Sequence, residues 1–508
     1  MAQAPSSSPG ALSRVPGARA VCYTAALHAP GENVTASCSD QPRVDELRQR
    51  FDARGQAHVF RFWEALDDGA RRRLAAQLAT LDLGAVERAV EAARRRGSAA
   101  PMALEPAPVE RLPEHGGDAA ARDRARADGE ALLSAGRVAV LVVAGGQGTR
   151  LGFPGPKGAL PIGPVSDRSL FGLQAQKLLR LRARYGAGVP WYVMTSHATD
   201  AQTRALFARE EHFGLPGDDV FFFRQASMPA VDFDGRLVLD RPDHVFESPD
   251  GHGGVIPALA ASGALDDIEG RGCTNVFYYQ VDNPLVRIAD PVYVGLHAGS
   301  GAEVSCKVVA KCDPMEKVGH VARIDGRVGI VEYTEIDAAQ RDARDADGAL
   351  VHWAGAISIY VWDTALLRRL SQAADRVLPL HASPKAIPVA GDDGLAVVPA
   401  APNGWKLERF VFDGLRCAKR VGVVETGREE YSPVKNADGG ESPATARRDL
   451  SALYRGWLAE AGIALPPGAG LVEIDESSFG GAQDFLARGI TRVAQAGDAI
   501  RIASGANR

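Results

Sequence analysis

The chain has 508 residues, of which 45% are hydrophobic, and a formal net charge of −5. This length exceeds what one small core can use, so we expect two or three domains. The slightly acidic balance argues against a nucleic-acid partner, and no apolar run approaches the ~20 residues that a membrane-spanning helix needs.

The N-terminal part of the sequence divides into segments of different character. Residues 1–42 are rich in Ala, Ser, Pro and Gly without any period, which predicts a disordered tail. Over 44–96 apolar residues recur every three to four positions, and this pattern predicts helices packed on the main body. Residues 97–118 are Pro-rich and irregular. We therefore predict a helical N-terminal domain with its linker over 43–118, followed by a short helix over 123–135.

The most informative stretch is a strand that runs into a glycine-rich turn. Residues 138–144 are all apolar and rich in valine, which predicts a strand buried on both faces in a parallel sheet. Gly145 and Gly146 lack a Cβ, so their backbone N–H groups can approach a phosphate closely. Arg150 and Lys157 add two cations to the same loop. The stretch therefore predicts a phosphate-binding loop.

The spacing of this loop differs from two common phosphate-binding patterns. A dinucleotide-binding loop has the pattern GxGxxG, whereas Gly146, Gly148 and Gly152 follow GxGxxxG. A Walker loop requires Ser or Thr after its lysine, whereas Lys157 is followed by Gly158. The loop must therefore belong to another class.

Strands and helices alternate after the loop. An amphipathic helix is predicted over 170–185, and strands over 190–195 and 220–225. This alternation predicts an α/β fold with a doubly wound, mostly parallel, Rossmann-like sheet, whose ligands bind at the carboxyl ends of the strands. We assign 119–400 to this α/β domain.

A later strand ends in an acidic residue. The run 274–281, which reads TNVFYYQV, is predicted to be a strand and leads directly to Asp282. Magnesium prefers one or two carboxylates together with phosphate oxygens, so Asp282 is a candidate Mg²⁺ ligand. A hairpin is predicted over 318–328, because Asp325-Gly326 is a strong turn signal.

The combined loop pattern resembles a known signature. Residues 145–152 read GGQGTRLG and are followed by Pro156-Lys157. This pattern resembles the sugar-1-phosphate nucleotidyltransferases, and its spacing resembles the eukaryotic-type UDP-sugar pyrophosphorylases, above all those acting on N-acetylglucosamine 1-phosphate. Further similar motifs extend the resemblance over roughly 45–490: Val281-Asp282-Asn283, Val331-Glu332-Tyr333, 406–413 and 431–436.

The resemblance implies a role for each motif residue that handles the nucleotide. Uracil and the adjoining nucleotide would be contacted by Gly145, Gly146, Gln225 and Gly251. The phosphates would be neutralised by the catalytic cations Arg150, Lys157 and Lys435, with Mg²⁺ on Asp282.

Sugar recognition is where the sequence departs from the resemblance. His252, Gly319 and Glu332 occupy the sugar-contacting positions, but the amino-sugar enzymes usually carry Asn in place of His252, whereas UDP-glucose pyrophosphorylases carry GHG as here. A segment that usually reads FNAGNI also lacks both asparagines, which are replaced by Trp353 and Ala356.

The implied reaction joins UTP and a hexose 1-phosphate to give a UDP-sugar and pyrophosphate, with Mg²⁺ as cofactor. N-acetylglucosamine 1-phosphate is the expected sugar substrate. Glucose 1-phosphate or several hexoses are the alternative, and a non-catalytic nucleotide-sugar sensor is an alternative of another class.

The C-terminal part, 401–508, is predicted to be a separate domain that becomes β-rich from about residue 465, where short apolar pieces alternate with turns. The six cysteines form neither a CxxC pair nor a zinc-finger spacing, which indicates reduced thiols and a cytoplasmic protein. The oligomeric state stays open.

Overall fold

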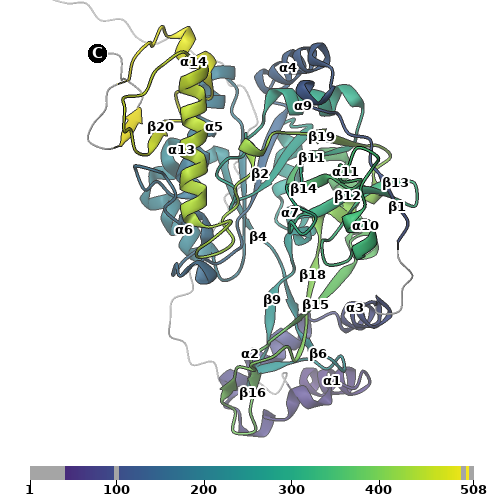
Figure 1. Ribbon diagram of the computed structural model, residues 1–508. Coiled ribbons are helices and arrows are strands. Elements are labelled where there is room, and N and C mark those ends of the chain that lie inside the picture. Colours follow the sequence, from purple (N-terminus) through teal and green to yellow (C-terminus); the bar gives the residue numbers. More distant parts are fainter. Residues whose placement is uncertain (1–40, 97–101, 494–498, 503–508) are drawn as a thin grey trace, which may run out of the picture.

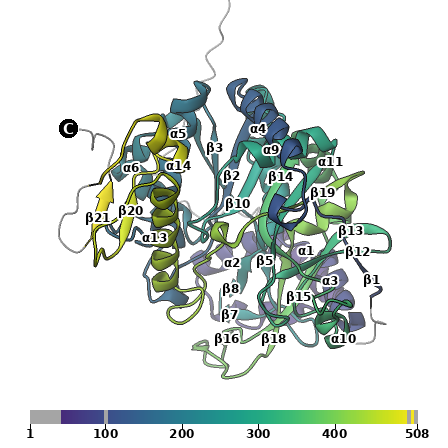
Figure 2. The ribbon, with the colours of Figure 1, turned by 45° about the horizontal axis from the view of Figure 1, so that its top comes forward.

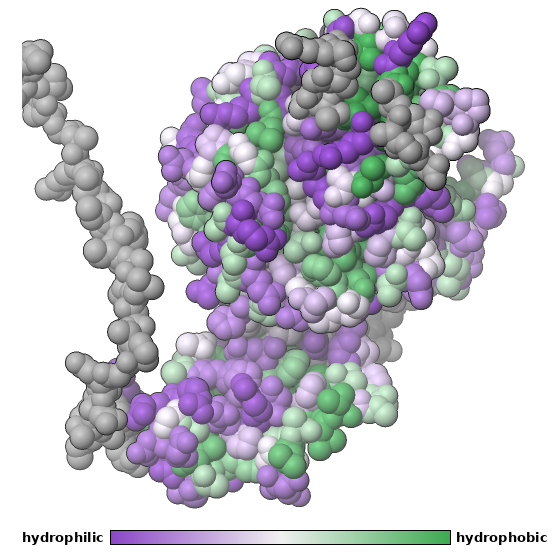
Figure 3. All heavy atoms as spheres, turned by 90° about the vertical axis from the view of Figure 1, so that its left-hand side faces the viewer, coloured by the Kyte–Doolittle hydropathy of each residue, from purple (hydrophilic) through white to green (hydrophobic). Residues whose placement is uncertain are grey.

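The computed structural model describes residues 41–96, 102–493 and 499–502. Apart from its last two residues, the predicted tail over 1–42 lies outside the described residues. Figure 1 shows a large α/β body with a smaller lobe below it, and in Figure 3 the surface narrows between the two. Within the described ranges, no helix is both long enough and apolar enough to cross a membrane.

A mixed sheet, with ten strands among the described residues, forms the centre of the body. In its parallel part β2 (Val138–Val143) lies between β10 (Asn275–Gln280) and β3 (Trp191–Thr195), and β4 (Val220–Arg224) lies outside β3. The buried apolar side chains of β2 confirm the predicted central strand. Because these four strands are parallel, the loops that follow them meet at one edge of the sheet.

Beyond β10 the sheet contains antiparallel pairs. The long strand β14 (Ala354–Asp363) runs antiparallel to β10, β11 (Val304–Ala310) and β12 (Gly319–Ile324). On its other side, β11 pairs in parallel with β19 (Val421–Glu425). The two halves of the sheet therefore meet at β10 and β14.

The predicted hairpin is confirmed as β12 paired with β13 (Arg327–Val331). Its two turn residues, Asp325 and Gly326, have φ angles of 52° and 77°, as a tight two-residue turn requires. The predicted irregular linker contains one strand, β1 (Leu104–Pro106), which pairs with β12. Three residues that end in proline give too short a pattern to be recognised as a strand.

Helices cover both faces of the sheet, which confirms the doubly wound α/β architecture. Val138, Val140 and Val142 of β2 pack in one hydrophobic cluster, whereas Ala139 and Leu141 pack in another. The first cluster includes residues of α4 (Ala119–Ser134), α5 (Leu170–Tyr185), α6 (Asp200–Arg209), α9 (Pro291–Ser300) and α13 (Pro443–Glu460). The second includes residues of α7 (Val255–Ala261), α8 (Ala264–Gly270), α11 (Thr364–Gln372) and α12 (Ala374–Val377).

The smaller lobe contains the predicted N-terminal helices, α1 (Gln41–Asp52), α2 (Asp68–Thr80) and α3 (Leu83–Arg96). Their buried side chains share a cluster with residues from much later in the chain, such as Leu407. The short strands of this region are β6 (Val231–Asp232), β7 (Leu239–Arg241), β8 (His244–Val245), β15 (Leu380–Lys385), β16 (Val389–Ala390), β17 (Ala396–Val397) and β18 (Gly404–Arg409). Other short elements are β5 (Ser227–Pro229), β9 (Glu247–Pro249) and α10 (Ala338–Asp342).

The C-terminal part begins with α13, which lies alongside α5 and α6 in Figure 2. Ser442 and Thr445 form a capping box that fixes the start of this helix. A parallel two-stranded sheet of β20 (Val472–Ile474) and β21 (Ile500–Ile502) follows, together with α14 (Ala482–Ala487). The domain boundaries at residues 118 and 400 stay a prediction.

Candidate active site

The turn after β2 is packed closely against a neighbouring strand end. A Cβ placed on Gly145 would lie 2.5 Å from Gln225 Oε1, so a larger residue there would displace the Gln225 side chain. Ser196 Oγ donates a hydrogen bond to the Gly145 carbonyl (2.8 Å), and the backbone N–H of Lys157 donates one to the Gly146 carbonyl (2.9 Å). The loop is thereby closed on itself, which holds Lys157 beside the end of β2.

Gln225 links this turn to the loop that precedes α7. Its Nε2 donates to Asp250 Oδ1 (3.2 Å) and to the Gly251 carbonyl (3.3 Å). Gly251 has a φ angle of 83°, and a Cβ there would lie 2.4 Å from the Arg409 carbonyl oxygen, so this position also requires glycine. Three predicted nucleotide-contacting residues, Gly145, Gln225 and Gly251, therefore form one continuous group.

The buried Asp250 beside Gln225 predicts a particular pH dependence of stability. Burial raises the pKa of Asp250 to about 6 from its ordinary 3.8, although Arg409 acts in the opposite direction. The folded state thus holds the proton more tightly than the unfolded chain. The resulting stabilisation is complete below about pH 4 and is lost as the pH rises through about 6.

We expect the wild type to lose about 2 kcal/mol of unfolding free energy relative to Asp250→Asn between pH 4 and pH 7. Urea titrations of both proteins at the two pH values measure this difference. Only the change with pH is diagnostic, because the asparagine also alters packing. Parallel pH profiles for the two proteins would contradict the assignment.

Lys157 and Asp282 come together from adjacent strands. The distance from Lys157 Nζ to Asp282 Oδ2 is 3.2 Å, and both side chains are largely buried. Asp282 follows β10, and its carbonyl accepts the backbone N–H of Val434 (2.9 Å). This bond connects the strand end to the segment that carries Lys435.

Lys435 is held by two partners that sequence reasoning did not identify. Its Nζ lies 3.1 Å from Glu441 Oε1 and 3.2 Å from Tyr431 Oη. Burial alone lowers the pKa of Lys435, but Tyr431, Glu441 and Asp282 outweigh it and hold the pKa above its ordinary value. Lys435 is therefore charged at neutral pH. The motif around residue 435 contains Tyr431, but nothing in the sequence shows that the two side chains meet.

A cavity of about 110 Å³ brings together four of the predicted residues, Asp282, Gly319, Glu332 and Lys435. They come from the end of β10, from the open end of the β12–β13 hairpin and from the segment before α13. A phosphate group near Lys435 and a polar group near Glu332 can therefore belong to one ligand.

The hairpin side of this cavity is shaped by small residues and one carboxylate. A Cβ on Gly319 would lie 2.6 Å from Ile330 Cγ2, so glycine lets the Ile330 side chain pack closely against this strand. Burial raises the pKa of Glu332, and nearby Glu335 raises it further. Ala356 lines the same cavity, as does Ser358, whose φ angle of 56° bends β14. The bend at Ser358 leaves no signal in the sequence.

His252 does not line this cavity. Its ring stacks on Phe410 with 18° between the ring planes, and its Nδ1 accepts the backbone N–H of Val411 (3.2 Å). Burial, and to a smaller extent the neighbouring His381, lower the pKa of His252 to about 4. The ring is therefore neutral at pH 7, and its remaining proton lies on Nε2.

Arg150 also lies apart from the cavity. It is exposed on the short 3-10 helix Thr149–Leu151, and within the described ranges its side chain makes no hydrogen bond or ion pair. The pKa of Lys406 in β18 is lowered mainly by burial, and the positive charges of Lys385 and Arg150 lower it further.

The donor set around Asp282 restricts how a metal could be held. The described part of the chain contains no group of three or more His, Cys, Asp or Glu side chains that could hold a metal ion. Magnesium often takes one or two carboxylates and completes its shell with phosphate oxygens. The residues present therefore fit a magnesium ion shared between Asp282 and bound phosphates.

Comparisons with known proteins show which family the chain resembles. A profile of the UTP–glucose-1-phosphate uridylyltransferase family matches residues 107–452. The human UDP-N-acetylhexosamine pyrophosphorylase-like protein 1 is 40% identical over 434 residues, which cover 82% of this chain and 86% of the human protein. The UDP-N-acetylglucosamine pyrophosphorylase of Saccharomyces cerevisiae is 38% identical over 353 residues, 67% of this chain and 74% of the yeast protein.

A solved structure supports the same relationship across almost the whole fold. The uridine diphosphate N-acetylglucosamine pyrophosphorylase of Trypanosoma brucei superposes with a TM-score of 0.76 at 27% identity, covering 92% of this chain and 99% of the other. The profile match and the human relative together establish the relationship. The chain belongs to the UTP–glucose-1-phosphate uridylyltransferase family.

Proposed function

We propose that this protein is a uridylyltransferase that makes a UDP-sugar and pyrophosphate from UTP and a hexose 1-phosphate. The observation that carries the proposal is the single cavity lined by Asp282, Gly319, Glu332 and Lys435, with Lys157 bonded to Asp282 at its edge. The names of the relatives point to an N-acetylhexosamine 1-phosphate as the sugar substrate.

The proposed reaction is an in-line displacement at the α-phosphorus of UTP. An oxygen of the sugar phosphate forms the new P–O bond, and the bond to the bridging oxygen breaks to release pyrophosphate. The attacking oxygen is already anionic, so no general base is required. The protein must position two polyanions and offset their charge, which Lys157 and Lys435 do directly. A Mg²⁺ ion on Asp282 would add charge neutralisation at the phosphates.

A second sugar substrate is favoured by specific residues in the structure. Ala356 stands in the cavity wall where the family resemblance leads us to expect asparagine, and His252 replaces another expected asparagine. The alanine at 356 removes an amide from the cavity wall, whereas His252 lies outside that cavity, against Phe410, and both changes leave Lys157, Asp282 and Lys435 in place. Glucose 1-phosphate, or several hexose 1-phosphates, is therefore the alternative substrate.

A substrate panel tests these proposals. Purified protein is incubated with UTP, Mg²⁺ and each of several sugar 1-phosphates, and the release of pyrophosphate is measured. A preference for N-acetylglucosamine 1-phosphate supports the first proposal, and a preference for glucose 1-phosphate supports the second. UTP binding without turnover on any sugar would overturn both and identify a nucleotide-sugar sensor.

Replacing His252 with asparagine is expected to change the sugar preference and not the chemistry. The neutral ring donates only from Nε2, whereas an asparagine amide can both donate and accept. We expect the ratio of kcat/KM values to move about tenfold toward N-acetylglucosamine 1-phosphate, the effect of roughly one hydrogen bond. KM for UTP serves as the internal control, and an unchanged ratio would exclude His252 from sugar recognition.

A cytoplasmic location belongs to the same proposal. It is supported by the four cysteines in the described residues, Cys273, Cys306, Cys312 and Cys417, which are all free thiols.

A further inference from the structure

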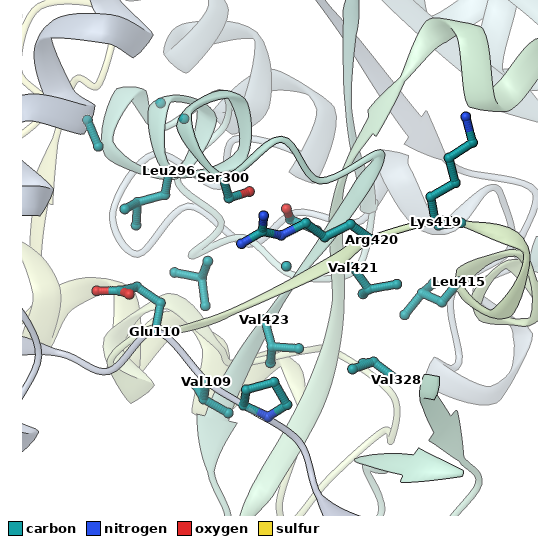
Figure 4. Close-up of a pocket in the computed structure, with 18 of the residues that line it drawn as sticks. Val109, Glu110, Leu296, Ser300, Val328, Leu415, Lys419, Arg420, Val421 and Val423 are labelled. Atoms are coloured by element: carbon teal, nitrogen blue, oxygen red, sulfur yellow. The ribbon is translucent and has the colours of Figure 1, made fainter. Parts of the chain in front are cut away.

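A second and larger cavity, of about 970 Å³, lies away from the candidate active site. Its walls come from α4 and α9, from the turn end of the β12–β13 hairpin, and from the start of β19. Figure 4 shows its interior, with Glu110 on one side, Ser300 above and Val423 below. None of the predicted site residues lines it.

The charge of this cavity is opposite to that of the chain as a whole. The protein carries a net charge of −5, but only two acidic side chains, Glu110 and Asp128, line the cavity. Five cationic side chains from three separate elements also line it: Arg124, Arg323, Arg327, Lys419 and Arg420. A concentration of cations on an acidic protein indicates an anionic ligand.

The backbone that carries two of these cations is fixed by Glu303. The Lys419 N–H donates to Glu303 Oε2 (2.7 Å), and the Glu303 N–H donates to the Arg420 carbonyl (3.0 Å). Arg369 holds the other oxygen of the same carboxylate (3.0 Å). In Figure 4 the Arg420 side chain extends across the cavity below Ser300.

Two of the four arginines that line this cavity, Arg323 and Arg420, are available to a ligand, whereas Arg327 donates to the Arg416 carbonyl (2.9 Å) and Arg124 pairs with Asp118 (3.7 Å). Within residues 41–96, 102–493 and 499–502, the Arg420 and Arg323 side chains make no hydrogen bond or ion pair, and both are exposed. Arginine binds phosphate oxygens through two parallel N–H groups, so such side chains are suited to a phosphorylated molecule.

The hairpin connects this cavity to the candidate active site. Arg323 and Arg327 lie beside its turn, where Ile324 pairs with Arg327. Gly319 and Glu332, which line the smaller cavity, lie at its open end. The two ends are separated by about five strand residues, or roughly 16 Å. A ligand that fixes the arginine end can therefore change the position of the sugar-facing end through one rigid element.

We propose that the cavity between α4, α9 and β19 is a regulatory site for a phosphate-bearing small molecule, whose binding alters the affinity of the active site for the sugar 1-phosphate. The binding part stands independently, whereas the regulatory part rests on the proposed function. The ligand is anionic, because the cationic residues that line the cavity outnumber the acidic ones.

Binding is tested with inorganic tripolyphosphate by isothermal titration calorimetry of the full chain. The titrations use the double variant Lys157→Ala/Lys435→Ala as the background protein. Its active site has lost two cations and therefore competes less for the anion. We expect saturable binding that Arg420→Glu and Arg323→Glu each weaken at least tenfold. Arg88→Glu, on the exposed face of α3, is the matched charge reversal and leaves the affinity unchanged.

Two results of this titration would overturn the binding site. One is the lack of saturable binding, and the other is equal affinity in Arg420→Glu and the background protein. Thermal unfolding of every variant shows whether that variant is folded. Titration of the wild type, for which two binding events are expected, keeps the test valid if the double background variant does not fold.

Regulation is tested by steady-state kinetics at saturating UTP and constant free Mg²⁺. Tripolyphosphate is expected to shift KM for the sugar 1-phosphate at least threefold in the wild type. Arg420→Glu is expected to abolish that shift while keeping the basal kcat/KM. Binding without any shift in KM would overturn the regulatory role. If the wild type shows no uridylyl transfer, the proposed function is refuted instead. The calorimetric titration would then still show whether the larger cavity binds the anion.

Discussion

Lys157→Ala is expected to lower kcat/KM about 10²-fold while leaving the fold intact. The ammonium group lies 3.2 Å from Asp282, at the cavity where the phosphates are proposed to bind. Removing one preorganised charge of this kind costs about 3 kcal/mol of transition-state stabilisation. Steady-state rates of pyrophosphate release measure the effect.

The fold should survive this substitution because the loop is closed by the backbone. The Lys157 N–H still donates to the Gly146 carbonyl in the alanine variant. Lys157→Arg, which keeps the charge, should retain part of the activity. Arg88→Ala, on the exposed face of α3, should retain all of the activity. Near-normal kinetics in Lys157→Ala would remove this residue from the catalytic mechanism.

The parts of the fold that the sequence predicted correctly are those with a strong local pattern. The all-apolar run of β2 and the Asp325-Gly326 turn each determine their structure through neighbouring residues alone. The direction of a strand relative to its neighbours could not be predicted in this way. A buried strand has the same composition whether its neighbour is parallel or antiparallel, so the pairing of β14 with β10 could not be foreseen.

In the candidate site, too, some residues could be predicted from the sequence and others could not. Glycines that require positive φ or close approach, such as Gly251, and charged residues at strand ends, such as Asp282, are visible as motifs. Partners contributed by distant segments are not visible. Glu441 holds Lys435 across a turn, and the cations of the larger cavity are separated by up to about 300 positions, so only the folded chain brings them together.

A buried ion network is the clearest feature that sequence patterns could not predict. Lys307 lies in the interior of β11, only 2% exposed, where an apolar residue would be expected. Its Nζ lies 2.7 Å from Glu430 Oε2 and 3.2 Å from Asp290 Oδ2. The Glu430 carbonyl accepts a hydrogen bond from Asn283 Nδ2 (2.7 Å), directly after Asp282. The network thus anchors the segment that carries Lys435 to the strand end that carries Asp282.

Lys307→Met is expected to lower the unfolding free energy by about 3–5 kcal/mol, because it leaves two carboxylates buried without their shared cation. Urea unfolding followed by tryptophan fluorescence measures the loss, since Trp191 and Trp362 are buried in the sheet. The double variant Lys307→Met/Glu430→Gln should recover part of it, because one of the unpaired charges is removed.

Measurements of kcat show whether the ion network positions Lys435 or only stabilises the fold. If the network positions Lys435, the double variant should regain stability without regaining kcat, because the neutral pair no longer fixes residues 430–435 against β11. Equal recovery of stability and kcat would show that the ion pair contributes only to folding. A loss below about 1 kcal/mol in Lys307→Met would contradict the network itself, since removing the buried cation between Glu430 and Asp290 costs more than that even with Arg287 3.7 Å from Glu430.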